Sequence, residues 1–183
     1  MINITPFKQT DSSRCGPASI KMVLAYYGIE ATEDEICSRC NWTYELGCTD
    51  HQMKAAIESY GLGCMIRNAS SLAEVEYWVR HRVPVIVDWF SPGTALGDMP
   101  CGHSSVVVDI DREFIYLMDP ELGSVRTILH DEFYRVWFDW REDPMITRWE
   151  DLVLRQIIIP YPKEFQYNGS TKGISQARTG SRV

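Results

Sequence analysis

The sequence has 183 residues, which is long enough for one domain with a hydrophobic core and too short for two domains of ordinary size. Hydrophobic residues make up 45% and charged residues 23% of the chain, which excludes a largely disordered protein. No secretory signal pattern and no stretch approaching the roughly 18 apolar residues of a membrane span are visible, so we expect a cytoplasmic protein. The formal net charge is −7, and the last 23 residues are basic, so the body is more acidic still. This acidity argues against binding to nucleic acids or anionic membranes.

The first predicted element is a helix that begins near Cys15. Pro17 suits its first turn, where the N–H that proline lacks would have no partner anyway, and Gly28 favours the backbone conformation that ends a helix. Free N–H groups and the helix dipole at such a start stabilise a thiolate over a thiol, so Cys15 is a candidate nucleophile. The apolar residues that recur at helical spacing along this segment are Ile20, Val23, Leu24 and Tyr27.

Gln9 lies six residues before Cys15, in a segment that could fold back beside the sulfur. An acyl-transfer site needs a hydrogen-bond donor for the negative charge that develops on the attacked carbonyl oxygen, and the Gln9 amide is a candidate for that donor. The alternative is that Cys15 is a small buried hydrophobic residue and that Gln9 is a solvated loop residue. The residues of this segment taken alone leave both interpretations open.

The segment between the first helix and residue 84 is predicted to be mostly helical. Thr32 and Glu35 have the spacing of a capping box and open a short helix. Thr49-Asp50 precedes a second helix and Ser70-Ser71 a third, each with apolar residues on one side. Residues 62–67 form a short apolar run between these two helices, which predicts a strand.

Four potential metal ligands lie within the first two of these helices and the loop between them. Cys37 and Cys40 form one close pair, and Cys48 and His51 form another, which is a spacing that suits tetrahedral zinc. Against zinc, Cys37 continues the apolar stripe of a predicted helix, and His51 falls in the first turn of the next one. We therefore favour packing roles for these residues and keep a zinc site as the alternative.

From residue 84 onward the pattern changes to short β-rich runs separated by turn residues. A loop rich in proline and glycine, residues 91–102, follows the first run, and we expect this loop with Asp98 to shape a substrate pocket. A turn at Asp111-Arg112 then joins the next two runs into an antiparallel hairpin. The three predicted strands cover residues 84–90, 103–110 and 113–119.

The open end of this hairpin carries a histidine and a carboxylate. His103 starts the first strand and Asp119 ends the second, so antiparallel pairing brings them together. A thiol nucleophile needs an imidazole that takes its proton and a third group that orients the imidazole, and these two residues are candidates for those roles. Taken singly, His103 could be a histidine bonded to a backbone carbonyl, and Asp119 an ordinary turn residue before proline.

The remaining residues complete the sheet and lead into a polar tail. We expect a strand over residues 125–128, a helix over residues 130–140 and a strong final strand over residues 152–159. Pro160 and Pro162 are expected to end regular structure.

Three blocks of this sequence together resemble the C39-like branch of the papain-like cysteine peptidases. In that family a glutamine, a cysteine at a helix start, and a histidine and an aspartate on two later strands follow in this order. Members fused to transporters tend to have an acidic residue before the cysteine, whereas this chain has Arg14, which favours a stand-alone relative. The matching residues are Gln9, Cys15-Gly16-Pro17-Ala18-Ser19, Tyr26-Tyr27-Gly28, Gly102-His103 and Asp119-Pro120.

The resemblance implies a papain-like α+β fold. Helices from the first half of the chain would pack against an antiparallel sheet from the second half, with the active cleft between them. We expect this single domain to cover residues 1–160 and a polar C-terminal extension to cover residues 161–183.

The resemblance also implies a cysteine peptidase that acts on a peptide or protein substrate. Cys15 would be the nucleophile, His103 the base and then the acid, Asp119 the group that orients the histidine, and Gln9 a donor to the oxyanion. No metal, nucleotide or organic cofactor is implied. The same residues would also serve an acyltransferase or transglutaminase-like enzyme, and a non-catalytic peptide-binding module of the same fold is a further alternative. The double-glycine specificity of transporter-linked relatives is not carried over to this chain.

Overall fold

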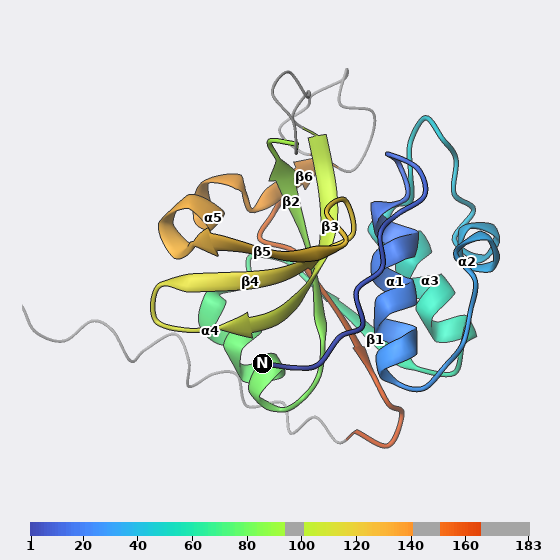
Figure 1. Ribbon diagram of the computed structural model, residues 1–183, viewed down its shortest axis with the longest axis horizontal. Helices are drawn as coiled ribbons and strands as arrows, with labels where there is room; N and C mark the ends of the chain where they lie inside the picture. The colour runs from blue at the N-terminus through green and yellow to red at the C-terminus, as the bar shows by residue number, and fades with distance from the viewer. Residues whose placement is uncertain (94–100, 141–150, 166–183) are drawn as a thin grey trace, which may run out of the picture.

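The computed structural model describes residues 1–93, 101–140 and 151–165, and these form an antiparallel sheet with helices on both faces (Figure 1). The helices are α1 (Cys15–Tyr26), α2 (Glu33–Arg39), α3 (Asp50–Ser59), α4 (Leu72–Arg80) and α5 (His130–Val136). The strands are β1 (Gly63–Arg67), β2 (Val85–Ser91), β3 (Cys101–Ile110), β4 (Phe114–Asp119), β5 (Ser124–Leu129), β6 (Phe138–Trp140), β7 (Leu152–Leu154) and β8 (Ile157–Tyr161). Six strands form one sheet in the order β1-β8-β2-β3-β4-β5, and β6 pairs with β7 separately.

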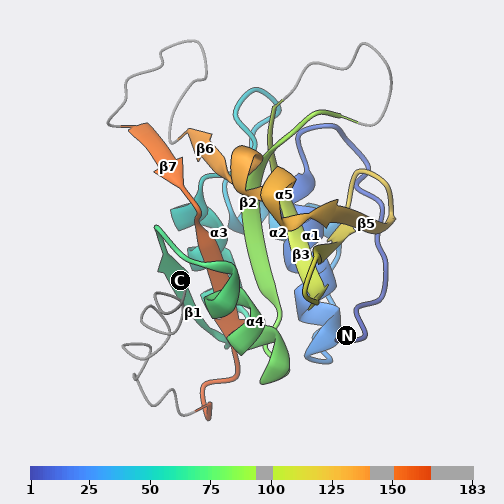
Figure 2. The same ribbon diagram turned by 90° about the vertical axis from the view of Figure 1, so that its left-hand side faces the viewer.

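Both faces of the central strands are buried, because helices cover the sheet from two sides. Along β2, Ile86 belongs to the hydrophobic cluster shared with α1 and α3, whereas its neighbours Val85 and Val87 belong to the cluster shared with α4 and α5. This arrangement explains why β2 reads as a continuous apolar run and not as an alternating one. Figure 2 shows α4 and α5 on the side of the sheet opposite α1. The α+β, papain-like class is therefore confirmed, with α4 on the far face of the sheet.

The first helix forms as its sequence predicts. Ile20, Val23 and Leu24 are fully buried against the sheet, and Gly28 takes a φ of +74° just beyond the helix end, a conformation that favours glycine. Ser19, on the same helix, donates a hydrogen bond from its hydroxyl to the carbonyl oxygen of Ser104 in β3, at 3.0 Å. This buried bond fixes the start of α1 against the strand that carries His103.

The helix caps predicted from sequence are also confirmed. The Thr32 hydroxyl accepts from the backbone N–H of Glu35 while the Glu35 carboxylate accepts from the backbone N–H of Thr32, which completes a capping box. Thr49 makes the same reciprocal pair with Gln52 at α3. Ser71 caps α4 by accepting a hydrogen bond from the backbone N–H of Glu74.

The chain after residue 129 departs from the prediction. The helix expected over 130–140 ends at Val136, and residues from Phe138 onward form β6 instead. The single strand expected over 152–159 is two strands, because Arg155 takes a φ of +49° between β7 and β8. Pro160 does not end regular structure, since it lies within β8 opposite Cys64 of β1. Pairing of β6 with β7 supplies the backbone partners that a longer helix would have provided internally.

The loop expected over residues 91–102 is shorter than predicted at both ends. Ser91 pairs with Cys101, and Phe90 pairs with Gly102, so β2 and β3 extend into the expected loop. Asp98 and the rest of residues 94–100 lie outside the described residues. In the expected C-terminal extension, Tyr161 still belongs to β8 and Phe165 packs against Trp78, while residues 166–183 lie outside the described ranges.

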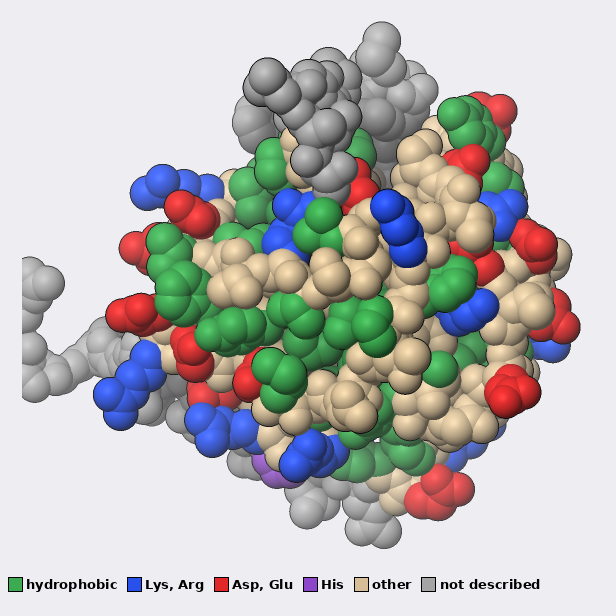
Figure 3. Space-filling model, viewed as in Figure 1, with side chains coloured by type: hydrophobic (Ala, Val, Ile, Leu, Met, Phe, Trp, Pro, Cys, Tyr) green, Lys and Arg blue, Asp and Glu red, His purple; other side chains and the backbone are tan. Residues whose placement is uncertain are grey.

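The strand β5 lies at one edge of the sheet, and its side chains are exposed or half-buried. Figure 3 shows hydrophobic side chains over β4 and β5 on this face of the molecule. The exposed apolar residues of this region are Leu122, Val125 and Leu129. Among the described residues, no helix is both long enough and apolar enough to cross a lipid bilayer.

Candidate active site

Cys15 is the first residue of α1, and its side chain is half-buried. The loop before it is held to neighbouring elements on two sides. On one side, the backbone N–H of Gln9 donates to the carbonyl oxygen of Pro120, at 2.8 Å, directly after β4. On the other, the indole N–H of Trp42 donates to the carbonyl oxygen of Ser13, at 2.9 Å. These bonds set the position of the thiol relative to the ends of β3 and β4.

Arg14, immediately before Cys15, forms a third anchor. Its guanidinium contacts the carboxylate of Glu33 at 3.2 Å and that of Asp34 at 2.7 Å, and it lies 4.6 Å from the ring centroid of Trp42. Glu33 is 5% exposed, so its charge needs this partner. Arg14 therefore ties the start of α1 to α2.

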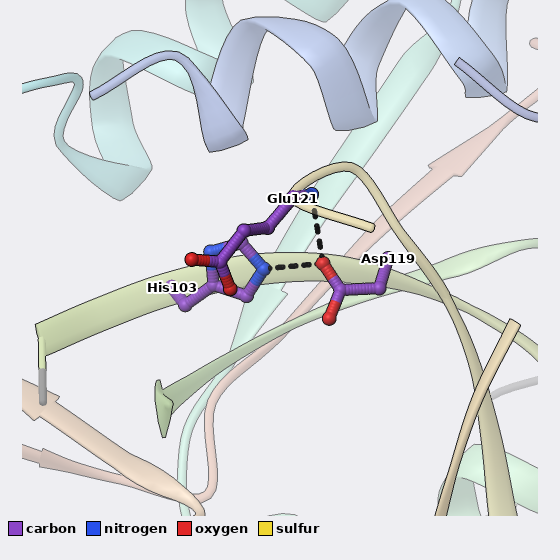
Figure 4. Close-up of side chains that lie close together, drawn as sticks. All are labelled: His103, Asp119 and Glu121. Carbon is purple, nitrogen blue, oxygen red and sulfur yellow. Dashed lines mark hydrogen bonds and ion pairs between the residues drawn. The ribbon is translucent and has the colours of Figure 1, made fainter. Parts of the chain in front are cut away.

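His103 and Asp119 lie in direct contact at the open end of the β3–β4 hairpin, as Figure 4 shows. The Nε2 atom of His103 is 2.8 Å from Oδ1 of Asp119, and the two side chains are 4% and 0% exposed. Val106 pairs with Met118, so Asp119 stands opposite Ser105 and reaches His103 diagonally across the ladder. The hairpin geometry inferred from sequence thus brings the imidazole and the carboxylate together.

The protonation of His103 is governed by competing effects. Burial lowers its pKa, but hydrogen bonds to Asp119 and to the Cys15 side chain, together with the negative charges of both groups, raise the pKa to about 10. Cys15 therefore lies close enough to His103 to act on the protonation of its ring. Both the Cys15 sulfur and the Asp119 carboxylate thus favour the protonated imidazole.

Asp119 remains ionised although it is fully buried. Burial raises its pKa, but hydrogen bonds and charges from His103 and from Arg126 outweigh this effect and leave the pKa below its usual value. The Nε of Arg126 is 2.5 Å from Oδ2 of Asp119, while the backbone N–H of Glu121 donates to Oδ1 at 2.9 Å. Each carboxylate oxygen is therefore satisfied by a fixed donor.

Arg126 is a site residue that the sequence analysis did not identify. It lies in β5 opposite Leu117, two positions before Asp119 on the neighbouring strand, so its side chain reaches the same face. Its guanidinium also lies 5.5 Å from the ring centroid of Trp89, whose ring packs edge-on against His103 at 5.7 Å between centroids. Only the pairing register of β4 with β5 could have indicated this residue.

The side chain of Gln9 is occupied by its own loop. Its Nε2 donates to the carbonyl oxygens of Asp11, at 2.8 Å, and Ser12, at 3.0 Å. The segment does fold back toward the site, because the Gln9 backbone is bonded to Pro120, directly after Asp119. The oxyanion role of Gln9 stays a prediction.

A second buried carboxylate lies on the strand next to His103. The hydroxyl of Ser104 donates to Oδ1 of Asp88 at 2.6 Å. Burial, helped by the negative charge of Asp139, raises the pKa of Asp88 to about 7. Burial likewise raises the pKa of Asp139 to about 6. The Asp139 carboxylate packs against Gly102, so a larger residue beside His103 would force this carboxylate to move.

The raised pKa of Asp88 predicts a defined pH dependence of stability. A carboxyl whose pKa is about 7 when folded and about 4 when unfolded binds more protons in the folded state, so the free energy of unfolding falls between pH 4 and pH 7. Asp88→Asn mimics the protonated form and still accepts from Ser104. We expect this variant to match the parent near pH 4 and to be more stable by about 1–4 kcal/mol above pH 7. Urea unfolding at several pH values measures this, and a difference independent of pH would contradict it.

Cys37, Cys40, Cys48 and His51, which were considered for zinc, do not come together as one group of ligands, although two of them are in contact. Among the described residues, the group of three metal-ligating side chains whose ligand atoms lie within 4.8 Å of one another is His103, Asp119 and Glu121, and hydrogen bonds already account for its contacts. Cys37 and Cys40 are buried in α2 and at its end, while His51 is exposed. The packing interpretation therefore fits Cys37 and Cys40, and Cys48 lies against Cys40.

The sequence of this chain matches the model of a known protein family. The model of the Peptidase_C39 like family matches residues 1–142. The chain belongs to this family. A search of curated proteins found no matching relative. The family resemblance inferred from Gln9, the Cys15 block and the His103 and Asp119 segments is thus confirmed.

Solved structures of C39 peptidases share the fold of this C39-like chain. A double glycine motif protease from an AMS/PCAT transporter, solved with its leader peptide, is 19% identical with a TM-score of 0.64 over 87% of this chain and 92% of that one. The peptidase domain of Streptococcus ComA, a bifunctional ABC transporter, is 17% identical with a TM-score of 0.66, over 88% and 100%. A C39-like peptidase from Bacillus anthracis is 16% identical with a TM-score of 0.63, over 88% and 96%.

Proposed function

We propose that this C39-like chain is a cysteine peptidase that hydrolyses a peptide or amide bond through Cys15, His103 and Asp119. The observation that supports it most is that His103 bonds to Asp119 at 2.8 Å and that the Cys15 side chain, at the start of α1, acts on the pKa of the same imidazole. A buried imidazole that interacts with both a sulfur and a carboxylate is what thiol-based acyl transfer needs.

In the proposed reaction, the Cys15 sulfur attacks the carbonyl carbon of the substrate while its proton resides on His103. The tetrahedral intermediate collapses when His103 gives that proton to the leaving amine, which breaks the carbon–nitrogen bond and leaves a thioester. His103 then takes a proton from water, the resulting hydroxide attacks the thioester, and the thiol is released with a carboxylic acid. Asp119, fixed by Arg126, keeps the imidazole in one orientation throughout.

The negative oxygen of the intermediate needs donors close to Cys15. The backbone N–H of Cys15 lies at the start of α1, where the helix dipole favours negative charge. We assign the second donor to Gln9, which would exchange one of its two bonds to the loop carbonyls for a bond to the oxyanion. Catalytic hydrogen bonds often tighten only when substrate is bound, which supports this exchange.

A peptide is the substrate class that the fold supports. The related transporter protease was solved with a leader peptide bound, and we propose that this chain also takes an extended peptide across the start of α1 and the end of β3. The double-glycine preference of that protein is not part of the proposal.

The proposal is tested with a peptide library incubated with the full chain, with Cys15→Ala as the inactive variant and with added primary amines in parallel. We expect new free N-termini that depend on Cys15. Cys101→Ala, which removes an exposed thiol from the same strand as His103, serves as the matched control and should retain cleavage. Amide-linked amine adducts in place of free acids would favour the acyltransferase instead. Binding of peptides with no cleavage by the parent chain would favour the non-catalytic module.

A further inference from the structure

Two cysteine sulfurs that are not part of the proposed catalytic site lie close together. Cys40 ends α2 and is fully buried, while Cys48 lies eight residues later, just before the cap of α3, and is half-buried. Their Sγ atoms are 2.9 Å apart, and either sulfur can be the hydrogen-bond donor. The proposed peptidase reaction uses neither residue.

The hydrogen bond between the two sulfurs shifts their pKa values in opposite directions. The bond from Cys48 lowers the pKa of Cys40, and the backbone N–H groups of Cys40 and Trp42 act in the same direction against the effect of burial. The bond to Cys40 and burial together raise the pKa of Cys48. Cys40 is therefore the sulfur that carries thiolate character, and thiolate is the form that attacks an oxidised sulfur.

We propose that Cys40 and Cys48 are a site of reversible oxidation, which forms a disulfide across the loop between α2 and α3 when a peroxide is the oxidant. Either sulfur can hold the shared proton, so once the pair has lost its other proton Cys48, the sulfur that solvent reaches, can react as the thiolate: it attacks a peroxide oxygen, breaks the O–O bond and becomes a sulfenic acid, and the other oxygen leaves as water. The Cys40 sulfur then attacks the Cys48 sulfur and displaces its hydroxyl group as water. Overall, two thiols lose two protons and two electrons, and hydrogen peroxide is reduced to two molecules of water.

The position of this loop connects the pair to the proposed nucleophile. The disulfide would enclose Trp42, whose indole N–H bonds to Ser13 and whose ring lies against Arg14, the two residues before Cys15. Gly47, at the other end of the loop, also approaches Ser13 closely. Oxidation would therefore join the two ends of the loop that contacts the residues before α1, so this loop becomes part of a covalent ring.

The test uses the full chain treated with hydrogen peroxide, followed by alkylation of the remaining thiols and digestion with trypsin. Arg39 and Lys54 are successive trypsin sites, so residues 40–54 form one peptide that contains both cysteines. We expect this peptide to lose two hydrogens and to take up no alkyl group, and dithiothreitol to restore two alkylated thiols. The disulfide should form at least tenfold faster in the folded chain than in urea, where proximity is lost.

Single-cysteine variants show which thiols form the disulfide. Cys48→Ser should abolish the disulfide, whereas Cys37→Ser, which changes another thiol of the same helix, should leave it intact. Cys15→Ala should also leave it intact, so the result does not depend on the proposed peptidase activity. Two alkylated thiols in the 40–54 peptide after peroxide treatment, or a disulfide that links Cys37 instead, would overturn the proposal.

Discussion

Replacement of His103 by alanine is expected to lower kcat for peptide hydrolysis by about 10³-fold or more, because Cys15 then lacks both its base and the acid that protonates the leaving amine. The rate of Cys15 alkylation by iodoacetamide at pH 7 should fall with it, since the imidazolium that would stabilise a thiolate at Cys15 is gone. Steady-state kinetics and mass spectrometry of the labelled Cys15 peptide measure the two effects.

The matched control for this variant is His51→Ala, which removes an exposed histidine from α3. It should leave both rates unchanged.

The stability of the His103 variant should also depend on pH in a defined way. A histidine whose pKa is about 10 when folded and about 6.5 when unfolded contributes stability that is complete below pH 6.5 and is lost as the pH rises to 10. The variant should therefore be destabilised most near pH 6 and least near pH 10. Equal activity in the two variants would contradict the catalytic assignment of His103.

Replacement of Arg126 by methionine is expected to cost about 3–5 kcal/mol of stability, because it leaves the buried Asp119 carboxylate with one charged partner in place of two. Asp119 is fully buried in the parent, so solvent does not compensate its charge there. The pKa of Asp119 should rise in the variant, and the stability that its charge contributes above the unfolded pKa should be lost at a higher pH than in the parent. Chemical denaturation between pH 3 and pH 7 measures both effects.

A double-mutant cycle separates this electrostatic effect from lost packing. Asp119→Asn removes the charge that Arg126 balances, so the double variant should be less destabilised than the sum of the single variants by more than about 1 kcal/mol. Strict additivity would show that Arg126 acts through its packing on Trp89 and not through Asp119. Arg80→Met, at an exposed pair with Glu76, is the control and should cost under about 1 kcal/mol.

Elements that depend on short-range interactions formed as the sequence predicts, whereas those that depend on long-range pairing did not. The helix that begins at Cys15, the capping boxes at Thr32 and Thr49 and the hairpin that joins His103 to Asp119 are all encoded within short stretches of sequence. Local propensity, capping and alternation determine these elements, and each formed close to its expected bounds. Errors arose where distant segments pair. The chain leaves the α5 helix at Val136 because β7, more than ten residues later, supplies the partner for β6.

By itself the sequence determined the family, the α+β fold and the candidates Gln9, Cys15, His103 and Asp119, because motif order and local spacing are sufficient for each. Tertiary structure alone decided that Arg126 forms an ion pair with the second oxygen of Asp119 and that the Gln9 side chain bonds to its own loop. It also decided that Cys40 contacts Cys48, whereas His51 is exposed to solvent. These contacts depend on strand register, on loop closure and on the direction of individual side chains. Such features are fixed only when the whole chain packs, since none has a periodic signal in the sequence.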